Sequence, residues 1–366
     1  MVGRTRYRLP LDESLLRKFD ALESVLDLRV IGSAPAGFPR SNGVFTLVPP
    51  LAVRALDGLV FHLLLPFRVA REIRAFEPTI VLVQGAHEAA FALVGRKLAR
   101  SRVPVVLDVH GDWRTATRFY GSSARRLLNP VGDRLAAWAV RRVDAVRTVS
   151  DFTTALVREL GVEPAATFPA FMDLQAFLGP PAPLPERPRA LFVGVLELYK
   201  GLDLLVEAWP RVAEQVPDAE LRLIGSGSRT DLARRLVARG PSVSWDGGLA
   251  PEEVAAELDA ATCLVLPSRR EGMGRVVVEA FCRGRAVVGT RGGGIEDLVV
   301  HGETGVLVPP DDVAALAAAL IEILTDRERA RQLGLRAYDG SGQWYAEPEE
   351  YAERVNALVE RADAGG

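Results

Sequence analysis

Lysine and cysteine are scarce in this sequence. The scarcity of lysine makes a lysine within a motif informative, and the scarcity of cysteine argues against a disulfide-stabilised protein. Only three of its 45 basic residues are lysines, so arginine supplies positive charge wherever a generic charge suffices, and a lysine within a motif is informative. The two cysteines, Cys263 and Cys282, stand in apolar surroundings, which is typical of free buried thiols rather than of a disulfide framework. We therefore expect a reducing, cytoplasmic compartment.

A strong net charge, a targeting segment and a long apolar run are also missing. The formal net charge of -2 gives no reason to expect a nucleic-acid binder. The first residues lack the apolar core of a signal peptide, so we expect no export. The longest apolar stretch, residues 59–69, contains His62 and Pro66 and is shorter than the ~20 residues of a membrane span, so it predicts a core helix. All four histidines are isolated, and without a chelating spacing we predict no required metal.

The length and the order of apolar segments predict two α/β domains. A chain of 366 residues exceeds the ~250–300 residues at which single cores stop growing. Short β-branched runs alternate with helical patterns, and this alternation starts again after a proline-rich segment at 178–189. We expect an N-terminal domain at 1–177, a linker at 178–189, a second domain at 190–342, and a C-terminal helix at 343–366 that crosses back to the first domain.

Strands and helices are predicted in regular succession in both halves. The predicted strands are 27–31, 44–48, 79–84, 104–110, 144–149 and 166–168 in the first half, and 190–194, 219–224, 243–245, 262–267, 286–290 and 305–308 in the second. The predicted helices include 11–26, 88–99, 133–142, 202–216 and 251–260. Parallel sheets bind ligands at the carboxyl ends of their strands, so we expect the site in a cleft there. The first strand is oddly short, because only Met1 and Val2 precede an expected loop at Gly3-Arg4.

The most informative segment is SRREGMGRVVVEAF, which follows a buried strand and opens a helix. The backbone amides of Gly272, Met273 and Gly274 can approach a ligand closely, and the amino end of the helix favours a phosphate. Glu271 enters from the loop, and Glu279 is expected about two turns into the helix. The first carboxylate suits sugar hydroxyls and the second a ribose diol. The alternative is that Glu271 only caps the helix and that Glu279 is an ordinary solvated side chain.

This segment resembles the paired-glutamate motif of glycosyltransferase family 4, whose usual form is Glu-Gly-Phe-Gly, a few apolar residues, then Glu-Ala. The resemblance implies the GT-B fold, in which two Rossmann-like domains face each other, and retention of anomeric configuration. It also implies that Glu271 holds the donor sugar and Glu279 the nucleotide ribose. Arg275 stands where the family usually has a small or apolar residue.

A second segment, residues 189–209, resembles the diphosphate-binding strand, turn and helix of the family. Lys200 lies at the turn, where an ammonium group can meet the charge that develops on the departing diphosphate. The family commonly has Gly-Arg where this sequence has Gly194-Val195, so one diphosphate arginine is absent. Arg4 or Arg275 could replace it, or Lys200 and the glycine-loop amides could suffice; we favour Arg4.

Two weaker matches and one histidine complete the candidate site. Gly225 and Ser226, in RLIGSGS, are expected to border the donor pocket, although such a turn is by itself generic. The stretch from Gly289 to Asp312 resembles the family's C-terminal glycine-rich region. His110 ends a buried strand at a position where the family often has a histidine that touches donor sugar or acceptor; the alternative is a structural loop histidine.

Asp108 and Asp112 flank His110, and a general base could be drawn from these three residues in an inverting enzyme. The resemblance argues against that role, because family members retain configuration and the leaving phosphate itself is thought to take the acceptor proton. His87, which also follows a strand, is interpreted as structural or acceptor-side. The family's Asn-Gly-Val-Asp near the linker is Ala-Phe-Met-Asp here, so its asparagine contacts do not transfer.

The expected function is transfer of a sugar from a nucleotide-diphosphate-sugar donor to an unknown acceptor, without a further cofactor. The alternatives are a nucleotide-sugar epimerase of the same fold and a catalytically impaired sugar-nucleotide-binding scaffold. Residues 113–142 carry seven arginines and a single acidic residue, interleaved with aromatic and apolar side chains. This segment could dock on anionic membrane beside a lipid-linked acceptor, or form a solvated arginine-rich face.

Overall fold

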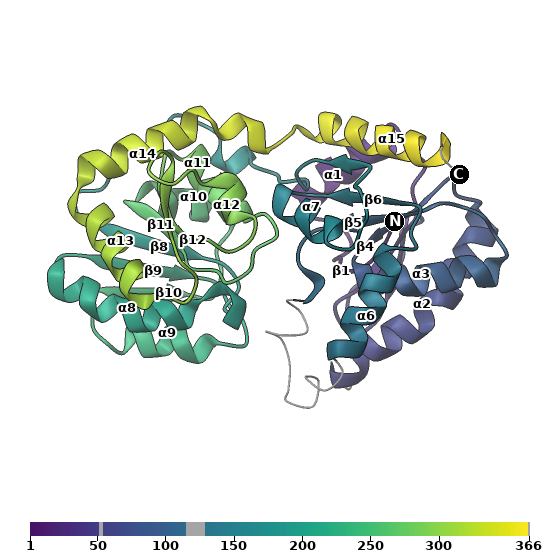
Figure 1. Ribbon diagram of the computed structural model, residues 1–366, viewed down its shortest axis with the longest axis horizontal. Coiled ribbons are helices and arrows are strands. Elements are labelled where there is room, and N and C mark those ends of the chain that lie inside the picture. Colours follow the sequence, from purple (N-terminus) through teal and green to yellow (C-terminus); the bar gives the residue numbers. More distant parts are fainter. Residues whose placement is uncertain (51–53, 115–128, 365–366) are drawn as a thin grey trace. The chain divides into compact units, whose positions relative to one another are not determined.

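The computed structural model describes residues 1–50, 54–114 and 129–364, which divide into two compact units. Unit 1 comprises residues 1–171 and 346–366, and unit 2 comprises residues 172–345. Each unit is built around its own parallel sheet with helices on both faces (Figure 1). The predicted architecture of two Rossmann-like domains is thereby confirmed.

Unit 1 contains a seven-stranded sheet in the order β3-β2-β1-β4-β5-β6-β7, and every pairing is parallel. The strands are β1 (Val2–Arg6), β2 (Val30–Ser33), β3 (Phe45–Val48), β4 (Val81–Gln84), β5 (Val105–Val109), β6 (Ala145–Thr148) and β7 (Ala166–Thr167). The chain order reverses direction between β1 and β4, which is the topological switch point where such sheets bind ligands.

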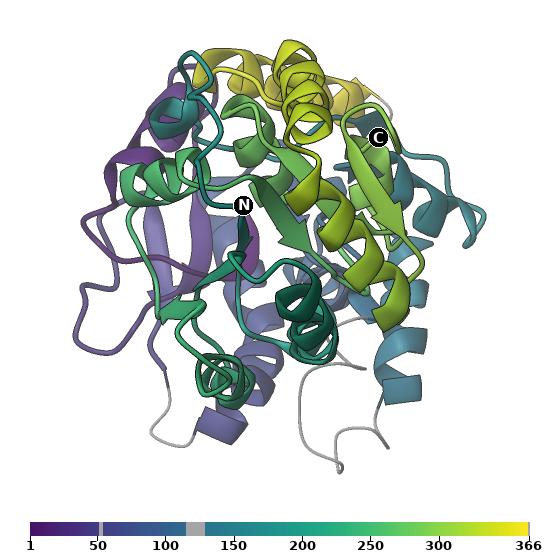
Figure 2. The ribbon, with the colours of Figure 1, turned by 90° about the vertical axis from the view of Figure 1, so that its left-hand side faces the viewer.

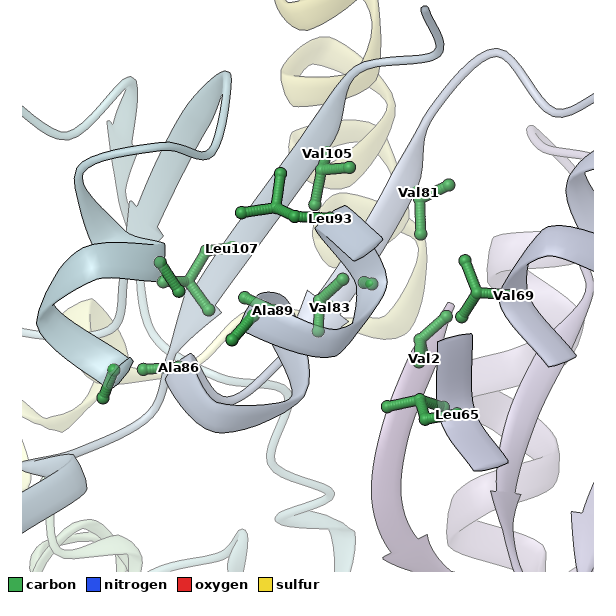
Figure 3. Packing of buried hydrophobic residues seen from close by; sticks show 14 of the residues in the cluster. Val2, Leu65, Val69, Val81, Val83, Ala86, Ala89, Leu93, Val105 and Leu107 are labelled. Carbon is green, nitrogen blue, oxygen red and sulfur yellow. The ribbon is translucent and has the colours of Figure 1, made fainter. Parts of the chain in front are cut away.

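Helices cover the two faces of this sheet around separate apolar cores. One core is formed by α2 (Arg54–Phe76), α3 (Ala86–Ala99), α6 (Asn129–Val140) and α7 (Asp151–Arg158) with the strands. Figure 3 shows Leu65 and Val69 of α2 around Val2 of β1, with Ala89 and Leu93 of α3 nearer to Val83 of β4. The other core lies under α1 (Glu13–Glu23) and α15 (Pro348–Ala364), where Phe19 and Tyr351 are buried. The C-terminal helix therefore packs on unit 1.

Unit 2 repeats the plan with six parallel strands in the order β10-β9-β8-β11-β12-β13. These are β8 (Arg189–Val193), β9 (Glu220–Ile224), β10 (Val243–Asp246), β11 (Cys263–Leu266), β12 (Ala286–Thr290) and β13 (Gly305–Val308). The helical elements are η1 (Gln175–Phe177), η2 (Leu198–Lys200), α8 (Leu202–Gln215), α9 (Thr230–Val237), α10 (Pro251–Asp259), α11 (Arg275–Cys282), α12 (Ile295–Leu298), α13 (Val313–Thr325), α14 (Arg327–Asp339) and η3 (Ser341–Trp344). Figure 2 faces this unit and shows its helices around the strands.

The first strand is longer than the sequence predicts. Gly3 and Arg4, expected to begin a loop, lie inside β1, which pairs with β2 on one side and β4 on the other. The apolar signal was weak because only Val2 and Gly3 are buried, while the remaining residues of the strand are exposed polar side chains. Apolar periodicity detects buried positions and misses a strand whose second half is exposed.

The proline-rich stretch at 178–189, predicted as a linker, lies within unit 2, and the division between the two compact units falls between residues 171 and 172. The buried guanidinium of Arg285 donates hydrogen bonds to the carbonyl oxygens of Ala182 at 2.8 Å and Pro183 at 3.3 Å. Arg327 donates in the same way to Glu186. Arginine side chains thus satisfy carbonyl groups that a segment rich in proline cannot pair in regular structure.

Candidate functional site

Unit 2 gathers most of the predicted site residues at the carboxyl edge of its sheet. Lys200 follows β8, Gly225 and Ser226 follow β9, and Glu271 follows β11. Neighbouring parallel strands end at the same edge, so residues far apart in the sequence are brought together there. Glu271 and Lys200, separated by 71 positions, are in direct contact.

The Lys200 ammonium donates a hydrogen bond of 2.6 Å to Oε2 of Glu271. Both side chains are largely buried, so this ion pair is shielded from solvent. Arg269 holds the two segments in place, because its guanidinium donates to Asp203 at the start of α8 and to the carbonyl oxygen of Leu198 in η2. The sequence pattern did not predict this role of Arg269. Its position two residues before Glu271 could have indicated that it lies near the site.

Glycine is required where the loops of this edge touch. Gly201 has φ 70°, and an added Cβ would lie 1.9 Å from the carbonyl oxygen of Pro267, after β11. Gly225 has φ 138°, and a Cβ there would lie 1.9 Å from the carbonyl oxygen of Gly194. Any larger residue would separate these loops and move Lys200 away from Glu271.

The C-terminal glycine-rich stretch supports the Glu271 loop. The amide of Glu271 donates to the carbonyl oxygen of Gly292, and the amide of Gly294 donates back to the carbonyl oxygen of Glu271. A Cβ at Gly294 would lie 2.2 Å from the carbonyl oxygen of Gly272. Residues 292–294 therefore position the Glu271 loop, a contribution that their weak sequence match does not specify.

The helix α11 begins at Arg275, with Gly274 as its N-cap at φ 82°. Its amino end therefore follows the Gly272–Gly274 loop directly, where the helix dipole favours an anion. Glu279 lies one turn into this helix and not two as predicted, because the helix starts four residues after Glu271. Met273 is buried in the loop.

Glu279 is buried and forms an ion pair with Arg275, whose Nε donates to Oε1 at 2.6 Å. Burial raises the pKa of the Glu279 carboxyl, and the Arg275 charge opposes that rise. The same guanidinium also donates at 2.9 Å to the carbonyl oxygen of Asp173. Arg275 is thus engaged twice, which the sequence did not indicate.

Unit 1 contains the remaining predicted residues. His110 follows β5, and its Nε2 lies 2.8 Å from Oδ2 of Asp108. Gly3 and Arg4 lie in β1, where Gly3 is opposite Gln84 of β4. The Arg4 guanidinium lies 3.6 Å from the carboxylate of Asp57 in α2 and is 43% exposed.

Asp108 has a structural role that the sequence did not reveal. Its other carboxylate oxygen accepts a 2.6 Å hydrogen bond from the buried Arg147 of β6. Burial alone would raise the pKa of Asp108, but the charges and hydrogen bonds of His110 and Arg147 hold it well below its usual range. A carboxylate with so low a pKa is a poor general base, which agrees with the expectation that Asp108 does not take the acceptor proton.

Replacing Asp108 with asparagine is expected to destabilise unit 1 by about 3–5 kcal/mol at pH 7. The buried Arg147 would lose its carboxylate partner and keep only its hydrogen bonds to the carbonyl oxygens of Phe168 and Pro169. The pKa of Asp108 is lower in the folded protein than in the unfolded chain, so its ionised form stabilises the folded state. This stabilisation is complete above the unfolded pKa of roughly 4 and declines as the pH falls toward the folded pKa. The cost should therefore shrink below about pH 4. Hydrogen exchange of the β5 and β6 amides measures it.

The matched control is Glu163→Gln, which breaks the exposed pair with Arg158 and should cost about 1 kcal/mol or less. Equal protection of the β5 and β6 amides in Asp108→Asn and the unsubstituted protein would refute the structural role of this ion pair.

Two further features bear on ligand binding. Among the described residues, no cluster of three or more His, Cys, Asp or Glu side chains has an arrangement that could hold a metal ion. A cavity of about 320 Å³ lies at the amino ends of the unit 1 strands and contains none of the predicted site residues. It is lined mainly by apolar side chains, such as Leu26, Ile73 and Val355.

Comparisons with known proteins show which family this chain is similar to. A family model described as Glycosyltransferase Family 4 matches residues 21–176, and one described as Glycosyl transferases group 1 matches residues 187–326. The GDP-mannose-dependent alpha-(1-6)-phosphatidylinositol monomannoside mannosyltransferase of Mycobacterium tuberculosis is 30% identical over 244 residues, which are 60% of this chain and 61% of that protein. The glycogen synthase of the same organism is 31% identical over 271 residues, 71% of this chain and 63% of that protein.

These matches thus span about three fifths of the length of the two relatives. Among solved structures, sucrose-phosphate synthase from Thermosynechococcus elongatus matches with a TM-score of 0.77 at 20% identity, covering 100% of this chain and 99% of that one. This likeness concerns the fold. With the two family models matching two successive segments of the sequence, the chain belongs to the family 4 glycosyltransferases of the GT-B fold.

Proposed function

We propose that this chain transfers a sugar from a nucleotide-diphosphate-sugar donor to an acceptor with retention of anomeric configuration. The observation that carries the proposal is the contact between Lys200 and Glu271 at the carboxyl edge of the unit 2 sheet, with Glu279 in the helix that follows. A cation and a carboxylate side by side suit a ligand that offers a charged diphosphate next to sugar hydroxyls.

In the proposed reaction the bond between the anomeric carbon and the diphosphate oxygen breaks, and a bond to the acceptor oxygen forms on the same face. The acceptor proton passes to the leaving phosphate. Lys200 stabilises the negative charge on that phosphate, and Glu271 holds the sugar. His110 contacts the sugar or the acceptor. Gly225, Ser226 and the Gly272–Gly274 loop border the diphosphate.

Arg4 is the proposed replacement for the absent diphosphate arginine, whose place Val195 occupies. Arg275, the other candidate, already binds Glu279 and the carbonyl oxygen of Asp173. The Arg4 guanidinium is partly exposed, and its contact with Asp57 is long, at 3.6 Å. Breaking such a contact costs little free energy, so the guanidinium is available to bind an anion.

The acceptor is proposed to be lipid-linked, and the enzyme to associate peripherally with anionic membrane. The relative whose name includes phosphatidylinositol monomannoside supports this choice. The arginine-rich segment at 113–142 was the basis of the membrane hypothesis, but Arg118, Arg125 and Arg126 lie outside the described residues. Among those described, no helix is both long and apolar enough to span a bilayer.

A panel of nucleotide sugars tests the function directly. We expect one donor to raise the thermal stability of the protein and to release its nucleoside diphosphate, and NMR of the glycosylated product should show the anomeric configuration of the donor. A chelator should leave turnover unchanged, because Lys200 is proposed to supply the charge that a metal would otherwise supply. Donor binding without any turnover would instead favour a non-catalytic scaffold.

Glu279→Gln is expected to weaken nucleoside diphosphate binding about 10- to 100-fold, because hydrogen bonds to a charged group are worth ~1.5–3 kcal/mol. Turnover at saturating donor should change little if Glu279 touches only the ribose. Titration calorimetry with UDP and GDP measures the affinity, and Glu328→Gln on the exposed surface serves as the control. An unchanged affinity would reject the ribose role.

A further inference from the structure

The outer surface of the layer formed by α2, α3 and α6 differs from an ordinary solvated surface. These helices lie side by side on one face of the unit 1 sheet (Figure 1). Their inner sides supply the core: Figure 3 shows Leu65 and Val69 of α2 and Ala89 and Leu93 of α3 packed among strand valines. The side chains on their outer sides, which we call the α2–α3–α6 face, are therefore available to a partner.

Large apolar side chains gather on this face. Leu59, Leu63 and Phe67 follow one another at four-residue intervals, so they form one stripe along α2, and Phe67 is 64% exposed. On the described part of the three helices, the exposed large apolar residues are Leu59, Leu63, Leu64, Phe67, Val94, Leu98, Val131 and Trp138. Isolated exposed apolar residues are ordinary, but a gathering over three adjacent helices indicates an interaction surface.

The basic and the acidic side chains of these helices differ in their exposure to solvent. Every exposed charged side chain on their described part is basic: Arg71, Arg74, Lys97 and Arg134. The acidic residues are Asp57, Glu72, Glu88 and Asp133, and none of them reaches the exposed class. The side chain of Arg71, for example, is 76% exposed, and that of its neighbour Glu72 is 20% exposed. The face therefore presents apolar groups and positive charge.

We propose that the α2–α3–α6 face docks on an anionic phospholipid bilayer. Apolar side chains enter the headgroup boundary and the surrounding cations meet lipid phosphates, with each basic residue near such a surface contributing about 1 kcal/mol. A second copy of the chain fits the face less well, because a twofold contact would set its basic residues against one another. The proposal rests on the proposed function in one respect: docking would bring the enzyme to a lipid-linked acceptor in the membrane.

Co-sedimentation with vesicles tests the proposal. The full chain should bind vesicles of phosphatidylcholine mixed with phosphatidylglycerol, and should not bind vesicles of phosphatidylcholine alone. The double variant Leu63→Glu/Phe67→Glu should lower binding at least tenfold. Arg71→Glu/Arg134→Glu should also lower it and remove its salt dependence. These side chains are exposed, so the fold should persist, as thermal melting can verify.

The control is Val237→Glu/Val300→Glu, which places the same charges at exposed apolar positions of unit 2 and should leave binding unchanged. Absence of binding, or equal binding by the control and the Leu63/Phe67 variant, would overturn the proposal. So would a dimer in light scattering that only the Leu63/Phe67 variant dissociates, since the occupant would then be a second copy.

Donor turnover, measured as release of nucleoside diphosphate from a water-soluble nucleotide sugar, needs no membrane. Measuring it beside vesicle binding therefore distinguishes a failure of docking from a failure of the proposed sugar transfer. Donor turnover without vesicle binding would refute docking, and with it the proposed membrane association, but would leave the proposed sugar transfer supported. Vesicle binding without turnover of any donor would refute the proposed function and leave docking supported.

Discussion

Lys200→Ala is expected to lower sugar transfer by about two to three orders of magnitude, the usual cost of removing one group that stabilises charge in a transition state. The ammonium is largely buried and lies 2.6 Å from Glu271, so its charge acts in a site that excludes most water. Because the charge on the diphosphate grows as the bond to the sugar breaks, the loss should fall on kcat more than on KM. Steady-state kinetics with the donor from the nucleotide-sugar panel measures both constants.

The control for this substitution removes an ordinary arginine from an exposed ion pair. Arg331 pairs with Glu328 on the surface of α14, so Arg331→Ala should leave transfer unchanged. Lys200→Arg is a second control, because it keeps the charge but changes its position. We expect partial activity from it. Full activity in Lys200→Ala, with an unchanged melting temperature, would contradict the assigned role.

The unit 2 strands were predictable because buried parallel strands are continuous apolar runs, and glycine turns mark where they end. β11 and β12 are fully buried, and both were predicted within two residues of their observed bounds. The candidate site followed from the same pattern, since the glycine loop after β11 carries Glu271. Contact between Glu271 and Lys200 required the strand order, in which β8 and β11 are neighbours.

Among the features that the sequence did not predict are two arginines that lie in the protein interior. Arg147 and Arg285 are fully buried, although arginine is ordinarily a surface residue. One pairs with Asp108, and the other supplies hydrogen bonds to the carbonyl groups of the proline-rich segment. In a chain with so many arginines, composition does not distinguish these two from the exposed ones. Their roles depend on tertiary contacts between distant segments.

Glu271→Gln is expected to lower transfer about 100-fold while leaving the affinity for nucleoside diphosphate nearly unchanged. The amide keeps the shape of the side chain but loses the charge that pairs with Lys200 and orients the sugar. Glu279, in the helix, is proposed to bind the ribose, so nucleotide without sugar should bind as before. Kinetics with the full donor and calorimetry with the nucleoside diphosphate distinguish the two roles.

Glu296→Gln is the matched control, because this exposed glutamate has only a 3.7 Å contact with Arg291. Combining Glu271→Gln with Lys200→Ala should cost much less than the product of the single effects, since groups that act as a unit are not additive. Multiplicative losses would mean that the two residues act separately. An equal fall in nucleotide affinity and transfer would place Glu271 on the nucleotide and exchange its role with that of Glu279.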